Sequence, residues 1–363
     1  DFVPAKRQTY TQESLLSQYV VLYQEAYNGL YSSRAPYAIT GWPLFLVHNQ
    51  DISFQLYLVR LNTILMNVGI IFFAFLITQT IFPKDDFLVL GVPILILFNP
   101  QHTHLLSAVN NGNLAELLTV ITLYFVIKGV IKGFTPIDGV VIVFFSLLAM
   151  WTKATAYFLL FVIGTIALFY LWQFRRNWRW LIPAGLILLG VSYVFLPARI
   201  QVLMSQAWIL LTSRDIYLDP IVPVVQFRSF WAMPGWLTLQ LHPIWYQILA
   251  VSCILAVVGL IVLLVTRRQL LFSKQFQPQI QALIILAVAA VVSVGILLGW
   301  SAMANTIAYR QGRSIYPVIV PLSLFLMLGW RQLIPATWRN FGLLAITAAL
   351  FLFDTMVLFH YII

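Results

Sequence analysis

Long apolar runs alternate with short polar segments along most of this chain. Ten runs reach, or nearly reach, the length of about 20 residues that a helix needs to cross a bilayer. They are 57–80, 87–99, 114–131, 137–152, 154–173, 181–198, 244–265, 280–301, 315–330 and 341–361. The second and fourth runs are short, which leaves re-entrant or broken helices open at both places. The pattern predicts an all-α polytopic membrane protein with about ten transmembrane helices.

The composition agrees with lipid as the main solvent. Of the 363 residues, 61% are hydrophobic and 9% are charged, and the mean hydropathy is +0.90. A soluble domain carries about 25% charged residues. The single cysteine, Cys253, excludes a disulfide framework and a cysteine-rich metal site. The net charge of +10 is scattered between the apolar runs, which is typical of topology signals and headgroup contacts rather than of nucleic-acid binding.

The basic residues predict how the helices are oriented. If the loop 173–180 is cytoplasmic, alternation of the spans places five basic connections on that side. They carry Lys84, Lys128, Lys132, Arg175, Arg176, Arg179, Arg267, Arg268, Lys274, Arg331 and Arg339. The other face then holds a first external loop, 1–56, and a long external loop, 199–243. Two groups of transmembrane helices, 57–198 and 244–363, complete the predicted organisation.

The external position of the N-terminus has a consequence. A chain that begins outside without a preceding hydrophobic segment is hard to export. We therefore expect an eleventh span before Asp1. We also expect a multi-pass protein of the plasma (inner) membrane, with its functional face periplasmic or extracellular.

The first external loop contains a predicted interfacial helix. Apolar residues recur at helical spacing between Gln12 and Glu25, and polar residues lie opposite them. Glu13 falls on the polar side. It is either a solvated surface carboxylate or a general base that faces a cavity.

A polar turn lies between the second and third runs, in "NPQHTHLLSAVNNGNLAELL". Asn113, with Glu116 three residues later, predicts a capped helix start of the capping-box type. Capping alone does not account for His102, His104, Asn110 and Asn111. Several hydrogen-bonding groups at a helix N-terminus predict the floor of a pocket for an anion or a sugar.

Aromatic residues gather in the long external loop. Arg228, Trp231 and Trp236 occur together in "QFRSFWAMPGWLTLQLHPIWY". Tryptophan at a membrane interface is often an anchor. Aromatic faces also stack on sugars, and arginine binds phosphate in a bidentate manner. Both interpretations stay open.

Three external cations are not required by the topology. Lys153 lies at the junction of two spans, and Arg310 and Arg313 precede the ninth. Lys153 either extends to the interface or meets a phosphate. The two arginines are either headgroup contacts or a diphosphate clamp.

Four stretches carry a resemblance to a known family. They are "QESLLSQYVVLYQEAYNGLY", the Asn turn quoted above, "SLLAMWTKATAYFLL", and "RSFWAMPGW" together with "YRQGRSIYPVIVPL". In this order they resemble the GT-C class of membrane glycosyltransferases, in particular bacterial relatives of the protein O-mannosyltransferases. The family motifs are an Asp-Glu pair, a Pro…Asn-Asn-Asp turn, a Leu-Thr-Lys stretch, and late Trp- and Arg-containing signatures. The similarity covers most of the chain.

The resemblance implies an inverting transferase with an external active site. Such an enzyme uses a polyprenyl-phosphate sugar as its co-substrate and is surrounded by membrane lipid. Glu13 corresponds to the carboxylate that acts as base, and Lys153, Arg310 and Arg313 correspond to phosphate contacts. His102, His104, Asn110, Asn111, Asn113, Trp231 and Trp236 are the expected sugar contacts, with Arg228 as a further phosphate contact.

The chain departs from the family pattern at four places, one of which is "RSIYP" in place of Arg-Tyr…Pro. Gln12 replaces the Asp before Glu13, Leu16 replaces a frequent His, and Gly112 with Asn113 replaces the acid of Asn-Asn-Asp. These departures motivate a second hypothesis, a catalytically degenerate structural subunit that packs against protein partners in a larger membrane complex. A transporter is a third hypothesis. The absence of an internal sequence repeat argues against it. The external acids have no metal-ligand spacing, so no metal and no cofactor beyond the lipid-linked sugar is expected.

Overall fold

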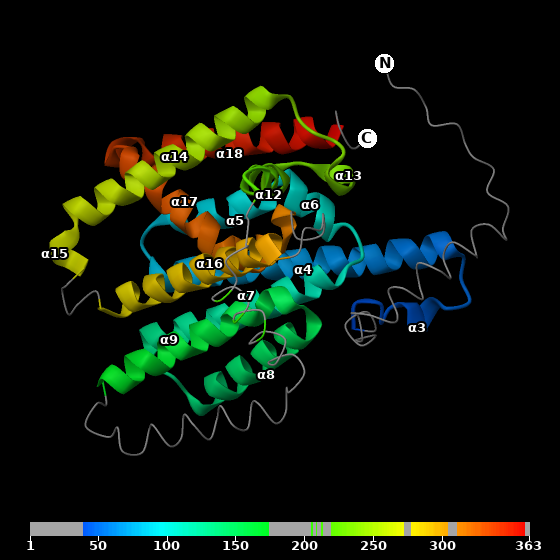
Figure 1. The fold of residues 1–363 in the computed structure, drawn as a ribbon, viewed down its shortest axis with the longest axis horizontal. Coiled ribbons are helices and arrows are strands. Elements are labelled where there is room, and N and C mark those ends of the chain that lie inside the picture. Colours follow the sequence, from blue (N-terminus) through cyan, green and yellow to red (C-terminus); the bar gives the residue numbers. More distant parts are fainter. Residues whose placement is uncertain are drawn as a thin grey trace.

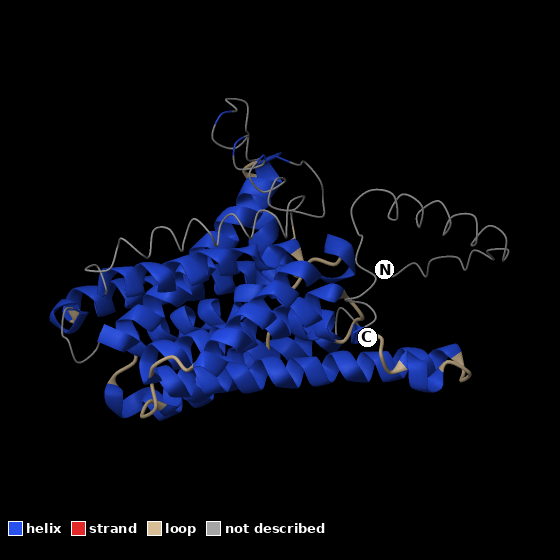
Figure 2. Ribbon diagram, turned by 90° about the horizontal axis from the view of Figure 1, so that it is seen from below, coloured by secondary structure: helices blue, strands red, loops and turns tan. Residues whose placement is uncertain are grey.

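The computed structural model describes residues 39–173, 205, 208, 212, 219–271, 277–303 and 311–359, and these are helical with no strand among them (Figures 1 and 2). The first part comprises α3 Leu44–Val47, α4 Ile52–Ile81, α5 Asp86–Leu97, α6 Pro100–Leu106, α7 Asn111–Lys132, α8 Pro136–Thr152, η1 Ala154–Tyr157 and α9 Phe158–Gln173. The second part comprises α12 Ile221–Trp231, α13 Pro234–Leu237, α14 Pro243–Thr266, α15 Arg268–Leu271, α16 Gln277–Met303, η5 Gly312–Val318, α17 Ile319–Leu333, η6 Ala336–Trp338 and α18 Arg339–Val357.

The prediction of an all-helical membrane protein is confirmed. Within the described residues, six helical segments are long and apolar enough to cross a membrane. They are Ile52–Ile81, Asn111–Lys132, Pro243–Thr266, Gln277–Ala302, Gly312–Leu333 and Ala336–Val357. Three further predicted runs coincide with shorter apolar helices, at Asp86–Leu97, Pro136–Thr152 and Ala154–Phe169. The run 181–198 lies outside the described residues, and the predicted count of about ten spans is not confirmed.

The described basic residues of the predicted cytoplasmic connections gather at one end of the helices (Figure 1). Arg331 at the end of α17 forms an ion pair with Asp85, which precedes α5. Arg339 lies within electrostatic reach of Arg331, Asp85 and Arg267. The residues from different connections therefore meet in space, as the alternation of spans requires. The opposite end holds α6, η1, α12 and η5.

Local chemistry explains how α7 and α8 form a hairpin. Gly133 ends α7 at φ 90°, a conformation that favours glycine. Thr135 and Asp138 then form a capping box around the start of α8, with Pro136 in its first turn. The Nζ atom of Lys128 donates to Oδ1 of Asp138 over 2.8 Å, which ties the two helices together.

Small residues allow α14 and α17 to pack closely. A Cβ on Gly259 would lie 2.0 Å from the carbonyl oxygen of Gly329, and a Cβ on Gly329 would lie equally close to that of Ala256. Such close backbone approach is typical of helix pairs in membranes. Trp330 supports the pair by donating from Nε1 to the carbonyl of Ser252 over 2.8 Å.

The buried core and the lipid-facing surface are separated along the helices. The core is formed by aliphatic residues such as Ile96, Leu123 and Met327, each 3% exposed or less. The outer side of α14 exposes Ile254, Val257, Ile261 and Val265, among other large apolar residues. An exposed apolar helix face of this extent fits contact with lipid chains.

Candidate functional site

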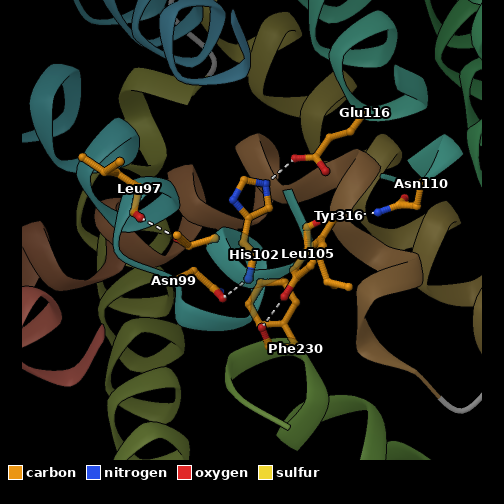
Figure 3. Close-up of polar contacts among 9 residues, drawn as sticks. Leu97, Asn99, His102, Leu105, Asn110, Glu116, Phe230 and Tyr316 are labelled. Atoms are coloured by element: carbon orange, nitrogen blue, oxygen red, sulfur yellow. Dashed lines mark hydrogen bonds and ion pairs between the residues drawn. The ribbon is translucent and has the colours of Figure 1, made fainter. Parts of the chain in front are cut away.

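Five elements converge at the end opposite the basic cluster. The turn η5 contacts α6, α7, η1 and α12 there, α12 also contacts α6, and η1 contacts both α7 and α8. The polar residues of the Asn turn lie at their centre (Figure 3). This is the part of the described chain where polar side chains from distant sequence positions meet inside the bundle.

The Asn turn is built by side-chain caps. Asn99 caps α6 by accepting from the backbone N–H of His102 over 3.0 Å. Asn110, and not Asn113, caps α7, because its Oδ1 accepts from the N–H of Gly112 over 2.7 Å. The prediction of Asn113 as N-cap is therefore wrong. Asn113 lies one turn further, buried, and its Nδ2 donates to the carbonyl of Ala108 over 2.8 Å. The turn closes tightly because two amide side chains are used to satisfy its backbone.

A buried carboxylate–histidine pair lies directly beneath this turn. Nε2 of His102 on α6 is 2.6 Å from Oε1 of Glu116 on α7, and the two side chains are 0% and 4% exposed (Figure 3). Nδ1 of His102 is buried and has no hydrogen-bond partner. The ring of Tyr316 on η5 lies edge-on to the imidazole, with 5.0 Å between ring centroids. The hydroxyl of Tyr316 donates to the carbonyl of Phe230 over 2.8 Å, so η5, α12 and α6 are held as one unit.

The tautomer of His102 follows from these contacts. With a single ring proton on Nε2, the imidazole donates to Glu116 and presents only an acceptor at Nδ1. A second proton would bury an N–H donor without an acceptor, which costs more free energy than an unused lone pair. The arrangement therefore favours the tautomer of His102 that carries its proton on Nε2.

Two cations lie close to this pair. A Cβ added to Gly112 would lie 3.0 Å from Nζ of Lys153 and 2.6 Å from Oδ1 of Asn110, so the lysine ammonium lies beside the first turn of α7. Burial, and after it the charge of Arg313, lower the pKa of Lys153 to about 8, against the opposing effect of Glu116. A helix N-terminus carries a partial positive charge, so it also disfavours a nearby cation. Lys153 and Arg313 therefore lie within electrostatic reach of each other at this end of the bundle.

A cavity of about 260 Å³ opens beside these cations. Its lining mixes polar and apolar side chains from α6, the Asn turn, α12, α13 and η5. The lining residues are Gln101, His104, Leu105, Ala108, Val109, Asn110, Ser229, Met233, Leu237, Gln311 and Arg313. The amide Nε2 of Gln311 is buried without a hydrogen-bond partner, and the side chain lies on the cavity wall. An unused buried donor at a cavity wall is a position where a ligand oxygen would be stabilised.

The cavity wall is fixed by long-range hydrogen bonds. Oε1 of Gln101 accepts from the backbone N–H of Met233 over 2.7 Å, which joins α6 to the segment between α12 and α13. Oγ of Ser229 accepts from the N–H of Gly312 over 2.7 Å. A Cβ on Gly312 would lie 2.2 Å from the carbonyl oxygen of Gln226, so only glycine allows η5 to approach α12 this closely.

His104 has a different character from His102. It lines the cavity, and burial lowers its pKa below the ordinary value of 6.5. It is therefore neutral at pH 7 and can donate from one ring nitrogen and accept at the other. This suits contact with hydroxyl groups better than contact with a phosphate.

The structure brings together only part of the predicted set. His104, Asn110 and Arg313 line the cavity, and Lys153 lies beside Asn110. His102 and Asn113 are buried and are used by internal hydrogen bonds. Asn111 occupies the first position of α7 and does not line the cavity.

The aromatic group of the long loop is dispersed. Trp231 is 3% exposed and belongs to the core, where its ring packs against Phe230. Arg228 lies over the ring of Tyr246 at 5.1 Å from its centroid. Glu13 and Arg310 lie outside the described residues, as does the side chain of Trp236.

Comparisons with protein-family models, with curated proteins and with solved structures found no match to this chain. Within the described ranges, no group of three or more His, Cys, Asp or Glu side chains gathers as a metal site would require.

The sequence pattern does not identify several residues of the site. Gln101, Ser229 and Gln311 line the cavity, and Tyr316 packs on His102. Gln101 and Gln311 are next to predicted site residues in the sequence, but their spacing does not mark them as site residues. The pairing of Glu116 with His102 across 14 positions depends on how α6 folds back on α7, which no local pattern encodes.

Proposed function

We propose that this protein is a membrane glycosyltransferase that takes a sugar from a polyprenyl-phosphate donor at the end of the bundle that holds the cavity. The observation that supports the proposal best is the position of Lys153 and Arg313. Both are at least partly buried and lie within electrostatic reach of each other; Arg313 lines the cavity, and Lys153 lies beside Asn110 on its wall.

The cation pair suits a phosphate group. Two like charges that are partly removed from water repel each other, and burial disfavours each of them separately. An anion between them would relieve both effects, and arginine adds a planar pair of donors that matches phosphate oxygens. The first turn of α7 supplies further backbone N–H donors on the same side.

The cavity suits a single sugar ring. Its volume of about 260 Å³ lies just under the roughly 300–1,000 Å³ that is typical of small-molecule pockets. His104, Asn110 and Gln311 offer hydrogen-bonding groups, and Leu105, Val109 and Leu237 offer apolar contact. A sugar presents both kinds of surface.

The proposed transfer is a single displacement with inversion. The carboxylate of Glu13 accepts the proton of the acceptor hydroxyl, whose oxygen forms a bond to the anomeric carbon. The bond from that carbon to the phosphate oxygen breaks, and the lipid phosphate leaves with the electron pair. Lys153 and Arg313 stabilise the charge that develops on the phosphate, an electrostatic contribution of the kind that dominates many enzymatic rate enhancements.

The membrane arrangement completes the proposal. About ten spans cross the plasma membrane, the basic end faces the cytoplasm, and the cavity end faces the periplasm or the exterior. A lipid-linked donor enters from the bilayer with its phosphate at the interface.

The test is transfer of a radiolabelled sugar from a polyprenyl-phosphate pool by the full chain in vesicles. Glu13→Gln is the test variant, and Glu25→Gln is the matched control on the same amphipathic segment. Transfer that is lost in Glu13→Gln and retained in Glu25→Gln supports the proposal. Binding without transfer in every protein, wild type included, favours the structural-subunit alternative, and neither binding nor transfer contradicts the proposal.

A further inference from the structure

One wall of the cavity holds a glutamine whose amide the fold does not use. Gln311 is 3% exposed and lines the cavity, and its Nε2 has no hydrogen-bond partner in the described part of the chain. A buried donor without an acceptor is unfavourable, and such groups are rare in folded proteins. The amide therefore marks a point where an acceptor atom of a ligand fits, and the transfer proposed above does not name that atom.

The backbone on both sides of Gln311 is fixed by hydrogen bonds. The N–H of Gly312 donates to Oγ of Ser229 over 2.7 Å, and the N–H of Ser314 donates to the carbonyl of Gln311 over 3.2 Å. The close approach of Gly312 to α12 leaves this segment little room to shift. An amide presented from a fixed backbone is preorganised, because binding then requires little further ordering of the chain.

Nearly half of the cavity lining is apolar. Of its eleven residues, five have apolar side chains, namely Leu105, Ala108, Val109, Met233 and Leu237. A plain hexose presents hydroxyl groups around its rim, and a hydroxyl buried against an apolar wall loses a hydrogen bond to water. A substituent that joins a carbonyl to a methyl group fits both the amide and the apolar wall.

One of the apolar residues has a strained backbone. Leu237 at the end of α13 has φ 73°, in the left-handed region that leucine rarely adopts. Glycine would relieve this strain, but it would remove an apolar side chain from the cavity wall. Strain of this kind is often found where a side chain serves a ligand. The conformation of Leu237 therefore favours a ligand with an apolar group at this wall.

The position of Gln311 along the chain indicates which sugar carbon carries the substituent. Gln311 and Arg313 both line the cavity and are separated by a single residue. In the proposed donor, the phosphate is attached to the anomeric carbon and is held by Arg313. The hydroxyl-bearing ring carbon next to the anomeric carbon is C2. A substituent at C2 is therefore the one nearest to both side chains.

We infer that the donor sugar is a 2-acetamido hexose and that Gln311 recognises its acetamido group. Nε2 of Gln311 donates to the acetamido carbonyl, and the methyl group packs against the apolar wall that includes Leu237. The N–H of the acetamido group finds acceptors on the same cavity, among them His104. The inference rests on the proposed function and names the substrate class of the same site.

Two lipid-linked sugars that differ only at C2 test the inference. One is a short-chain polyprenyl-phosphate N-acetylglucosamine, and the other is the glucose compound with the same lipid and the same anomeric configuration. The affinity of each for the full chain in detergent is measured by microscale thermophoresis. Gln311→Leu is the test variant, because leucine is similar in size to glutamine and has no amide.

The matched control is Gln279→Leu. Gln279 lies near the start of α16, at the basic end of the bundle (Figure 1), and its Oε1 is buried without a partner among the described residues. Leu237→Gly is a second test variant. Glycine removes the apolar contact and accepts the left-handed backbone, so this variant should be as stable as the wild type while it loses part of the preference.

The wild type should bind the N-acetylglucosamine compound about tenfold or more tighter than the glucose compound. Gln311→Leu should reduce this preference to about threefold or less. Leu237→Gly should lower it by about threefold or more, and Gln279→Leu should leave it unchanged.

Equal affinities of the two compounds for the wild type overturn the inference and leave the proposed function standing. A full preference that survives in Gln311→Leu does the same. If Gln311→Leu does not fold, an unchanged preference in Leu237→Gly overturns the inference. If neither compound binds the wild type, both the inference and the proposed function fail.

Discussion

His102 on α6 and Glu116 on α7 share a hydrogen bond of 2.6 Å in the interior of the bundle, 14 positions apart in the chain. The bond closes the Asn turn from below, while Asn110 and Asn113 close it from above by bonding to the backbone carbonyls of Leu105 and Ala108. The turn therefore has a fixed shape, and Lys153 is held against it.

Removing the carboxylate should destabilise the fold. Glu116→Ala leaves the imidazole N–H of His102 buried without an acceptor, which costs about 1–3 kcal/mol, and the deleted side chain leaves a cavity that adds to this cost. Glu116→Gln keeps an acceptor oxygen and should cost about 1 kcal/mol. Reversible unfolding of the detergent-solubilised protein measures both. Equal stability of the two variants would show that the hydrogen bond does not hold the turn.

The glycine contact between α14 and α17 can be tested with a matched pair of variants. In Gly259→Ala the new Cβ would lie 2.0 Å from the carbonyl oxygen of Gly329, so the helices must separate. We expect a loss of about 1–3 kcal/mol in the free energy of unfolding, as for other overpacked contacts. Gly295→Ala on α16 meets no heavy atom within 4 Å and should change stability by less than about 1 kcal/mol. A Gly259→Ala protein as stable as the Gly295→Ala protein would contradict this packing.

Much of the helical framework could be predicted from the sequence, because lipid imposes a single rule on each span. Nine of the ten apolar runs coincide with described helices, and their alternation brought Arg331, Arg339 and Asp85 to one end as expected. Span length was the weaker inference. α5 and α8 are 12 and 17 residues long, so apolar composition alone did not establish that they cross a bilayer.

The site was predicted less well, for a physical reason. The sequence predicts the cap of α7 at Asn113, because a Glu three residues after an Asn fits a capping box. In the structure Glu116 is committed to His102, and the cap falls to Asn110. Partners that meet only after α6, α12 and η5 converge, such as Gln101 with Met233, leave no local pattern to detect.

Anion binding should depend on the charge of Lys153. Its pKa in the folded protein is about 8 against an ordinary value of 10.5, so the lysine loses its charge as the pH rises through about 8. The affinity for dimethyl phosphate should be constant below pH 7 and fall by up to about tenfold per pH unit above pH 8. Lys153→Arg keeps the charge and should remove the fall up to pH 10. A flat profile in the wild type would contradict a role for this ammonium.

The lowered pKa of Lys153 also makes the stability of the protein depend on pH. Between about pH 8 and pH 10.5 the unfolded chain binds more protons at this lysine than the folded protein does. The contribution of Lys153 to stability therefore rises with pH across that window and is constant below it. Lys153→Met should remove this rise, whereas the exposed Lys132→Met should leave it unchanged, as measured by unfolding at pH 7, 9 and 10.

The orientation in the membrane is open to a labelling experiment. Ser107, near the cavity, and Lys132, at the basic end, are both exposed and lie at opposite ends of α7 and its turn. Cysteines at these positions, in a Cys253→Ser background, should react differently with an impermeant maleimide in intact cells. Ser107→Cys should be labelled from outside and Lys132→Cys only after the membrane is opened. The reverse result would place the cavity in the cytoplasm.

The central claim is that Lys153 and Arg313 hold the phosphate of a lipid-linked sugar. It is tested most directly by the affinity of the full chain for a short-chain polyprenyl-phosphate hexose. Lys153→Gln and Arg313→Gln should each weaken binding about tenfold or more, because each removes one charge-assisted hydrogen bond to the phosphate. Lys132→Gln, at the opposite end, should bind as the wild type does. Equal affinities in all four proteins, or no binding to the wild type, would contradict the account.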